Sequence, residues 1–114
     1  MNKDTKIYLS LVVIIAVIIL GIFAMKNNNE TPEEKLAKCI GENAMAYIQI
    51  GCSACKYQES LFGDNYKYIK TIDCKVEIQK CIDTEITGTP TWIINGVRYP
   101  GAQSIEKLKE LTGC

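Results

Sequence analysis

The pattern Cys52-Ser53-Ala54-Cys55 most constrains what this chain can fold into, because it separates two segments that predict different secondary structure. Before it, residues 44–50 are nearly all apolar, which is typical of a strand buried on both faces. After it, residues 56–62 can continue as a helix. Two thiols at this spacing can close a small disulfide ring and reopen it. The pattern therefore predicts a redox pair at a strand–helix junction.

A second motif, Thr89-Pro90, enters another apolar segment at residues 91–94, which predicts a strand. Proline tolerates a cis peptide bond at a cost of about 0.5–1 kcal/mol. It also leaves its neighbour's backbone groups free for an incoming strand. We therefore predict a cis bond between Thr89 and Pro90. An ordinary trans proline at the start of the strand is the alternative.

The rest of the chain predicts an alternation of helices and strands. Helices are expected at 31–40, 56–62 and 75–86 and after Ser104, and strands at 44–50, 66–73, 91–94 and 97–99. This order, α-β-α-β-α-β-β-α, is that of the thioredoxin fold, an α/β architecture. In it a parallel strand pair precedes an antiparallel hairpin, and helices cover both faces of the sheet.

Local signals set several of these boundaries. Thr31-Pro32 is expected to start the helix at 31–40, because proline favours the first helical position. Gly41 is expected to end this helix. Asn95-Gly96 predicts a two-residue hairpin turn. Interior positions are expected at Ile78, Ile82 and Ile86, at Ile105, Leu108 and Leu111 of a helix capped by Ser104, and at Trp92, Tyr99, Tyr66 and Tyr68.

The N-terminal segment predicts a membrane anchor. Residues 7–25 carry no charge, and as a helix they would reach roughly 28 Å, close to the thickness of a bilayer core. Lys3 and Lys6 precede this run, so the positive-inside rule places the N-terminus in the cytoplasm and the rest outside. We expect a single-pass protein of the cell membrane, with an anchor at 1–25, a linker at 26–30 and an extracytoplasmic thioredoxin-like domain at 31–114. A cleaved signal peptide is the alternative.

The composition limits the possible chemistry. Six cysteines in 114 residues fit an oxidising compartment. There is no histidine, which removes the commonest general base and the commonest metal ligand. Basic and acidic residues balance at 13 each, so charge gives no reason to expect a nucleic-acid partner. A zinc site at Cys52 and Cys55 would need two more ligands. We expect neither a metal nor another cofactor.

The position of each cysteine in the motif predicts its role. Cys52 should lie at the helix N-terminus, where free N–H groups favour its thiolate, so it is the attacking sulfur. Cys55 should be more buried and resolve the mixed disulfide, while Lys56 adds positive charge. Some thioredoxin-fold enzymes carry a buried carboxylate at the position of Ala46. Since residues 43–54 contain no Asp or Glu, the proton of Cys55 must pass to water or to a group such as Glu59, which we interpret as part of a solvated helix face.

Several motifs together resemble a known family. They are Cys52-x-x-Cys55 with Lys56, Leu61-Phe62-Gly63, Cys74, Cys81, residues 86–96 around Gly88-Thr89-Pro90-Thr91-Trp92, and Gly101-x-Gln103-Ser104. Over about residues 35–113 the chain resembles the thioredoxin-like domain attached to vitamin K epoxide reductase homologues of prokaryotes. Two features depart from that family: Ser53-Ala54 stands where it usually has Pro-His, and one apolar segment stands where it has the reductase domain.

The resemblance implies a thiol oxidoreductase that forms disulfides in exported proteins. It implies reoxidation by a quinone-linked membrane protein similar to vitamin K epoxide reductase. It also implies that the loop of Thr89 and Pro90 pairs with the backbone of a bound substrate. Finally, it implies a second disulfide between Cys74 and Cys81, for which a relay of oxidising equivalents to the Cys52-x-x-Cys55 motif is the alternative role.

Two cysteines, Cys39 and Cys114, remain, and a third disulfide between them would tie the C-terminus to the domain. The sequence alone does not choose among the possible pairings. Two other functions stay open. One is a disulfide reductase or isomerase, which the missing Pro-His favours. The other is a non-catalytic thiol or copper carrier, which would not require the Thr89-Pro90 loop.

Overall fold

The computed structural model describes residues 2–26 and 29–114. These residues belong to two compact units, one ending at Thr31 and one comprising Pro32–Cys114. Residue 1 of the expected anchor and residues 27 and 28 of the expected linker lie outside the described residues.

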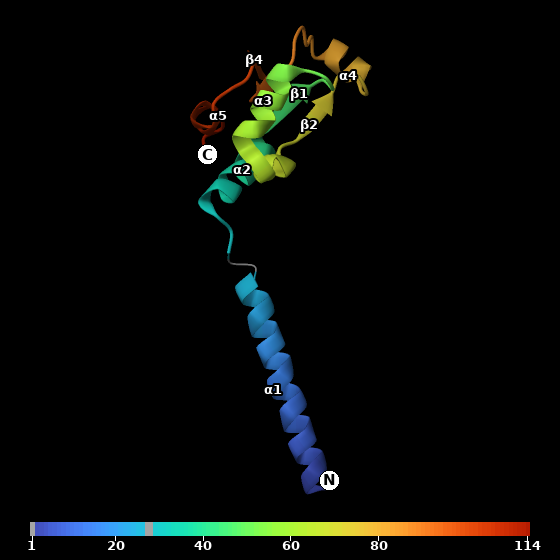
Figure 1. The fold of residues 1–114 in the computed structure, drawn as a ribbon, viewed down its shortest axis with the longest axis vertical. Helices are drawn as coiled ribbons and strands as arrows, with labels where there is room; N and C mark the ends of the chain where they lie inside the picture. The colour runs from blue at the N-terminus through green and yellow to red at the C-terminus, as the bar shows by residue number, and fades with distance from the viewer. Residues whose placement is uncertain (1, 27–28) are drawn as a thin grey trace. The chain divides into compact units, whose positions relative to one another are not determined.

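The first unit is a single helix, α1 (Lys3–Lys26), drawn in blue in Figure 1. Its residues 7–25 carry no charge and are predominantly apolar around the whole circumference, as expected for a helix that contacts lipid on all sides. By length and composition, α1 can cross a membrane.

The second unit is built on a four-stranded sheet with the order β2-β1-β3-β4. The strands are β1 (Ala44–Ile48), β2 (Thr71–Asp73), β3 (Thr91–Ile94) and β4 (Val97–Pro100). β1 pairs with β2 in parallel, and the β1–β3 and β3–β4 pairs are antiparallel. A parallel pair followed by an antiparallel hairpin is the topology of the thioredoxin fold, as the sequence predicts.

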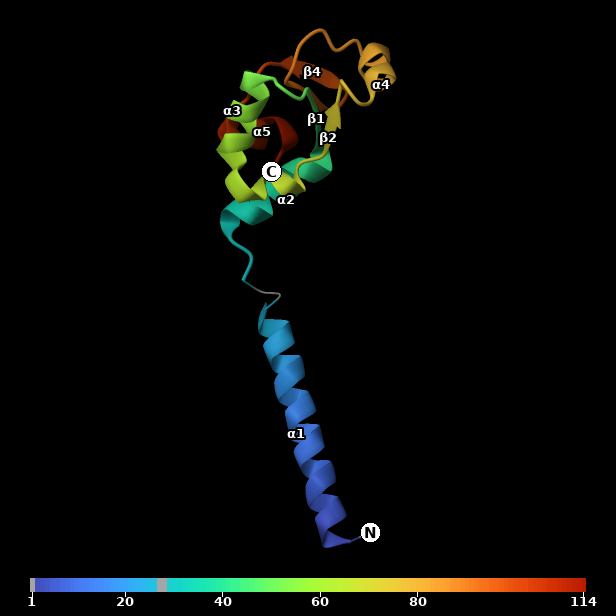
Figure 2. The same cartoon turned by 45° about the vertical axis from the view of Figure 1, so that its right-hand side comes forward.

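Helices cover both faces of this sheet. They are α2 (Pro32–Asn43), α3 (Ser53–Phe62), α4 (Ile78–Asp83) and α5 (Ile105–Thr112), with a 3₁₀ helix η1 (Gly63–Tyr68) after α3. α2, α3 and α5 contribute side chains to the main core on one face, whereas α4 packs on the other face through a smaller cluster. Figure 2 shows α3 and α5 on one side of the strands and α4 on the other.

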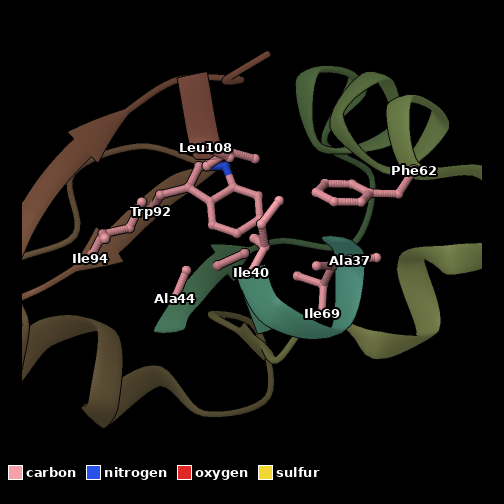
Figure 3. Packing of buried hydrophobic residues seen from close by; sticks show 9 residues of the cluster. Ala37, Ile40, Ala44, Phe62, Ile69, Trp92, Ile94 and Leu108 are labelled. Atoms are coloured by element: carbon pink, nitrogen blue, oxygen red, sulfur yellow. The ribbon is translucent and has the colours of Figure 1, made fainter. Parts of the chain in front are cut away.

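The main core is centred on Trp92, which is fully buried as predicted (Figure 3). Its indole lies 6.2 Å from the ring of Phe62, measured between centroids, and packs in the same cluster as Ile40 and Leu108. In the sheet, Trp92 pairs with Ala46, whose small side chain leaves room for the indole. The position where some thioredoxin-fold enzymes carry a carboxylate is therefore part of this apolar core.

Gly41 does not end the first helix, contrary to the sequence-based prediction, because α2 continues to Asn43. Gly41 is buried against η1, and a Cβ atom at this position would collide with the carbonyl oxygen of Tyr68. The glycine thus allows close approach of two backbones rather than a change of direction.

The predicted strand at 66–73 is wrong over most of its length. Residues 63–68 form η1, and only Thr71–Asp73 is a strand. In η1 the ring of Tyr66 lies 6.1 Å from that of Phe62, and the Tyr68 hydroxyl donates a hydrogen bond to Glu34 of α2. Packing of the two tyrosines against helices overrides their preference for strands.

The predicted helix at 75–86 is also too long, because α4 spans only Ile78–Asp83. Ile78 and Ile82, predicted to face inward, are 58% and 61% exposed, whereas Cys81 is buried against the sheet. The Oδ1 atom of Asp73 accepts a hydrogen bond from the Lys75 N–H, and this turn replaces the first helical turn.

Other local predictions are confirmed. Asn95 and Gly96 both have positive φ angles, 52° and 75°, as a two-residue hairpin turn requires. The Oγ atom of Ser104 accepts a hydrogen bond from the Lys107 N–H at 3.1 Å, so Ser104 caps α5. Leu108 of α5 is fully buried in the main core.

Candidate active site

Cys52 and Cys55 form a disulfide at the point where β1 passes into α3. β1 ends at Ile48, and Gly51 turns the chain with a φ of 85°, a conformation that glycine adopts without strain. Cys52 is the N-cap residue of α3. Cys55 is only 6% exposed, while Cys52 is half-buried, so Cys52 is the more accessible residue of the pair.

The helix N-terminus surrounds the Cys52 sulfur with positive potential. Its Sγ accepts a hydrogen bond from the Cys55 backbone N–H at 3.1 Å, in the manner of a capping side chain. The N-terminal end of a helix carries about half a positive elementary charge, which favours a thiolate over a thiol. The geometry therefore suits Cys52 as the nucleophile of the reduced pair.

The loop of Thr89 and Pro90 lies directly beside this disulfide. The carbonyl oxygen of Thr89 is 3.4 Å from the Cys52 Sγ, and the peptide bond between Thr89 and Pro90 is cis. Pro90 is fully buried, and its carbonyl oxygen accepts a hydrogen bond from the Gly101 N–H at 2.8 Å. Thr91 anchors the loop further, since its hydroxyl donates to the Gly88 carbonyl at 2.7 Å. The structure thus brings all four predicted residues of the site together.

Gln58 fixes α3 in place, and the sequence analysis did not identify it. Its side chain is fully buried. The Oε1 atom accepts hydrogen bonds from the Trp92 indole N–H at 2.9 Å and from the Gln103 N–H at 2.7 Å, and its Nε2 donates to the Gln103 carbonyl at 2.9 Å. A signal was present, because Gln58 lies one helical turn before Phe62 and three residues after Cys55, on the inward face of α3.

A cavity of about 230 Å³ opens beside Cys55. Its lining includes Ile48, Cys52, Cys55, Lys56, Glu59 and Tyr66. Burial raises the pKa of the Tyr66 hydroxyl, and the negative charge of Glu59 makes a smaller contribution in the same direction. Glu59 is exposed, as interpreted from the sequence, but it also faces the buried cysteine's cavity, which the sequence did not indicate.

The remaining four cysteines form two further disulfides. Cys74 follows β2 and pairs with the buried Cys81 of α4, with a Cα–Cα distance of 5.7 Å. Cys39 of α2 pairs with Cys114 across a Cα–Cα distance of 6.0 Å. Within residues 2–26 and 29–114, no three His, Cys, Asp or Glu side chains gather as metal ligands would.

No family model matches the chain. It is 32% identical over 79 residues to the thiol-disulfide oxidoreductase LTO1 of Arabidopsis thaliana, an alignment that covers 61% of this chain and 21% of that protein. The chain thus spans about a fifth of the length of this relative. It also matches the solution structure of the oxidised thioredoxin from Plasmodium falciparum with a TM-score of 0.46 and 20% identity, over 69% of this chain and 88% of that one. By its sheet order Pro32–Cys114 is a thioredoxin-fold domain, and the chain is similar in sequence to part of a thiol–disulfide oxidoreductase.

Proposed function

We propose that this chain is a membrane-anchored thiol–disulfide oxidoreductase that forms disulfides in exported proteins. One observation carries the proposal: Cys52 is only half-buried at the N-terminus of α3 and its Sγ lies 3.4 Å from the Thr89 carbonyl, while Cys55 is buried one turn further on. The similarity to a protein named a thiol–disulfide oxidoreductase supports the same chemistry.

In the proposed reaction, a substrate thiolate attacks the Cys52 Sγ of the Cys52–Cys55 disulfide. The bond between the two sulfurs breaks, Cys55 leaves as a thiolate and takes up a proton, and a mixed disulfide joins Cys52 to the substrate. A second substrate thiolate then attacks the substrate sulfur, forming the substrate disulfide and releasing Cys52 as a thiolate. The substrate loses two electrons, and the Cys52/Cys55 pair gains them.

The Thr89-Pro90 loop is proposed to hold the substrate during this exchange. Its carbonyl at Thr89 borders the reacting sulfur, and the Gly101 hydrogen bond to Pro90 keeps the loop in position. An extended substrate segment that pairs with the backbone of Thr89 would place its own cysteine beside Cys52.

The proposed anchor is residues 1–25, most of which lie in α1, with residues 26–30 as linker and 31–114 as the extracytoplasmic domain. Lys3 and Lys6 before the apolar run favour this orientation, and three disulfides fit an oxidising compartment. For reoxidation we propose a vitamin K epoxide reductase-like membrane protein, to which the reduced pair passes its two electrons. This partner is suggested by the motifs that resemble the domain attached to such proteins.

Oxidation of a reduced, unfolded thiol protein by the full chain in detergent tests the proposal. The purified oxidised chain should consume substrate thiols and become reduced at Cys52 and Cys55, as peptide mapping after alkylation reports. Cys52→Ser should abolish the exchange. In the reduced chain, Cys55→Ser should trap a mixed disulfide when an oxidised partner is offered, and Ser60→Ala, at an exposed position of the same helix, should match the wild type.

Two outcomes would overturn the proposal. An unchanged rate of exchange in Cys52→Ser would show that Cys52 is not the reacting sulfur. Exchange that proceeds only when a reductant is supplied and the substrate is already disulfide-bonded would identify a reductase or isomerase instead.

A further inference from the structure

Disulfide exchange at this site moves a proton at Cys55, and that proton needs an acceptor. Cys55 is only 6% exposed, so bulk water reaches its sulfur poorly. The fully buried Ala46 occupies the β1 position that could have carried a carboxylate. Residues 43–54 contain no acidic side chain at all. The proton acceptor must therefore come from another element.

Glu59 has the required placement. It lies four residues after Cys55 on α3, so the two Cβ atoms are about 6 Å apart on one face of the helix. Both residues line the cavity of about 230 Å³ beside the disulfide. A water molecule takes up about 30 Å³ in the liquid, so the cavity has room for water that bridges a carboxylate and a thiol.

The other titratable groups around this cavity do not provide a base. Lys56 is cationic, and the Lys75 Nζ approaches the same end of the sheet near Gly51. The pKa of the Tyr66 hydroxyl is raised, first by burial and then by Glu59, so the phenol keeps its proton at neutral pH. Its shift also indicates that the Glu59 charge is felt inside the cavity. Among the described residues that line the cavity, Glu59 is the only carboxylate.

We propose that Glu59 is the proton acceptor for Cys55, acting through water in the cavity, in place of a carboxylate on the sheet. This inference rests on the proposed function and assigns one further residue to it. When the reduced pair resolves a mixed disulfide, the Cys55 thiol gives its proton through water to the Glu59 carboxylate. The Cys55 thiolate attacks the Cys52 Sγ, the Cys52–Cys55 bond forms, and the partner leaves as a thiolate that is then protonated from solvent.

Glu59 could act as a base or only through its negative charge, and the two roles predict opposite effects of Glu59→Gln on the rate of resolution. A nearby negative charge raises the pKa of a thiol, so its removal alone would give more Cys55 thiolate and faster resolution at neutral pH. Loss of a base removes the route for the proton and slows resolution. We expect slowing by about tenfold or more at neutral pH. The Glu59→Gln rate should then rise only as the thiol ionises at alkaline pH.

Single-turnover kinetics with dithiodipyridine separate the two steps. The full chain in detergent is reduced at Cys52 and Cys55 only, which peptide mapping verifies, and then mixed with the reagent. Attack by Cys52 releases one coloured thiopyridone, and resolution by Cys55 releases the second. Glu59→Gln should leave the first phase nearly unchanged and slow the second, and Glu59→Asp should restore part of it. Glu42→Gln, which removes a charge from an exposed position on α2, is the matched control.

Each other result would overturn the inference. A second phase that is unchanged or faster in Glu59→Gln would leave the carboxylate with no role as a base. An equal slowing in Glu42→Gln would assign the effect to net charge, and slowing in Lys56→Met but not in Glu59→Gln would assign the proton to Lys56. The wild-type chain tests the proposed function separately, because absence of both coloured phases would contradict the redox activity itself.

Discussion

Removal of the Cys39–Cys114 disulfide should destabilise the domain about twice as much as removal of Cys74–Cys81. In the chain-entropy description, a disulfide stabilises by restricting the unfolded chain, and the effect grows with the logarithm of the loop that it closes. The two bridges span sequence separations of 75 and 7 residues. The corresponding contributions are about 4.5 and about 2.4 kcal/mol at 25 °C.

These values are large for a domain of this size. Small proteins have free energies of unfolding of about 5–15 kcal/mol, so the longer bridge can account for much of the total. For a domain of 60–100 residues, each kcal/mol shifts the Tm by about 4–8 °C. The double variant Cys39→Ala/Cys114→Ala should therefore melt at least 15 °C below the wild type, by the same approximate scale. Cys74→Ala/Cys81→Ala should melt roughly half as far below it.

Trp92 supplies the assay, because it is the only tryptophan of the chain and is fully buried in the core. Urea unfolding of the full chain in detergent, followed by Trp92 fluorescence, gives the free energy of unfolding of each double variant. Equal losses in the two variants, or a larger loss at Cys74–Cys81, would refute the loop-closure reasoning. In that case local contacts of each disulfide, and not the length of the closed loop, would determine the stability.

Four other outcomes are expected. Gly41→Ala should destabilise the domain by about 1–3 kcal/mol in the same urea assay, because its Cβ has no space. Gln58→Leu should lower the free energy of unfolding by about 1–3 kcal/mol for each buried donor left unpaired, beginning with the Trp92 indole N–H. A double-mutant cycle with Trp92→Phe would measure the energy of the hydrogen bond between Gln58 and Trp92. A membrane-impermeant maleimide should label reduced Cys52 in intact cells, and labelling only after lysis would contradict the orientation. In a graded dithiothreitol titration with alkylation mapping, Cys52 should become free before Cys74.

The parts of the fold that follow local rules could be predicted from the sequence. Asn95-Gly96 forms the hairpin turn because both residues tolerate positive φ angles, and Ser104 caps α5 because its hydroxyl can accept a backbone N–H. The junction at Cys52 and the loop at Pro90 were also predictable. Each depends on a short motif whose residue types restrict the backbone directly.

The parts that depend on contacts distant in the sequence could not be predicted. Tyr66 and Tyr68 favour a strand by intrinsic preference, but their packing against α3 and α2 holds them in a 3₁₀ helix. From the sequence, Gly41 predicts the end of a helix, because its contact with the backbone of η1 appears only in the folded structure. Glu59 likewise reads as a surface residue, because only the fold of η1 and β1 around α3 creates the cavity that it faces.

The position of the cysteines explains why one disulfide should exchange while its neighbour stays closed. β1 and β2 are parallel, so Cys52 and Cys74 both follow strands that end at the same edge of the sheet, and the Cys74 N–H donates to the Ile48 carbonyl there. Proximity to the reacting edge therefore does not distinguish them. Their position relative to a helix distinguishes the two cysteines. Cys52 caps the ten-residue α3 and accepts a hydrogen bond from a backbone N–H, which stabilises its thiolate in the reduced form. Cys74 lies outside any helix and Cys81 is buried within α4, so neither thiolate gains in this way. A disulfide whose reduced form is stabilised has the higher potential, and we therefore expect Cys52–Cys55 to be the pair that accepts electrons.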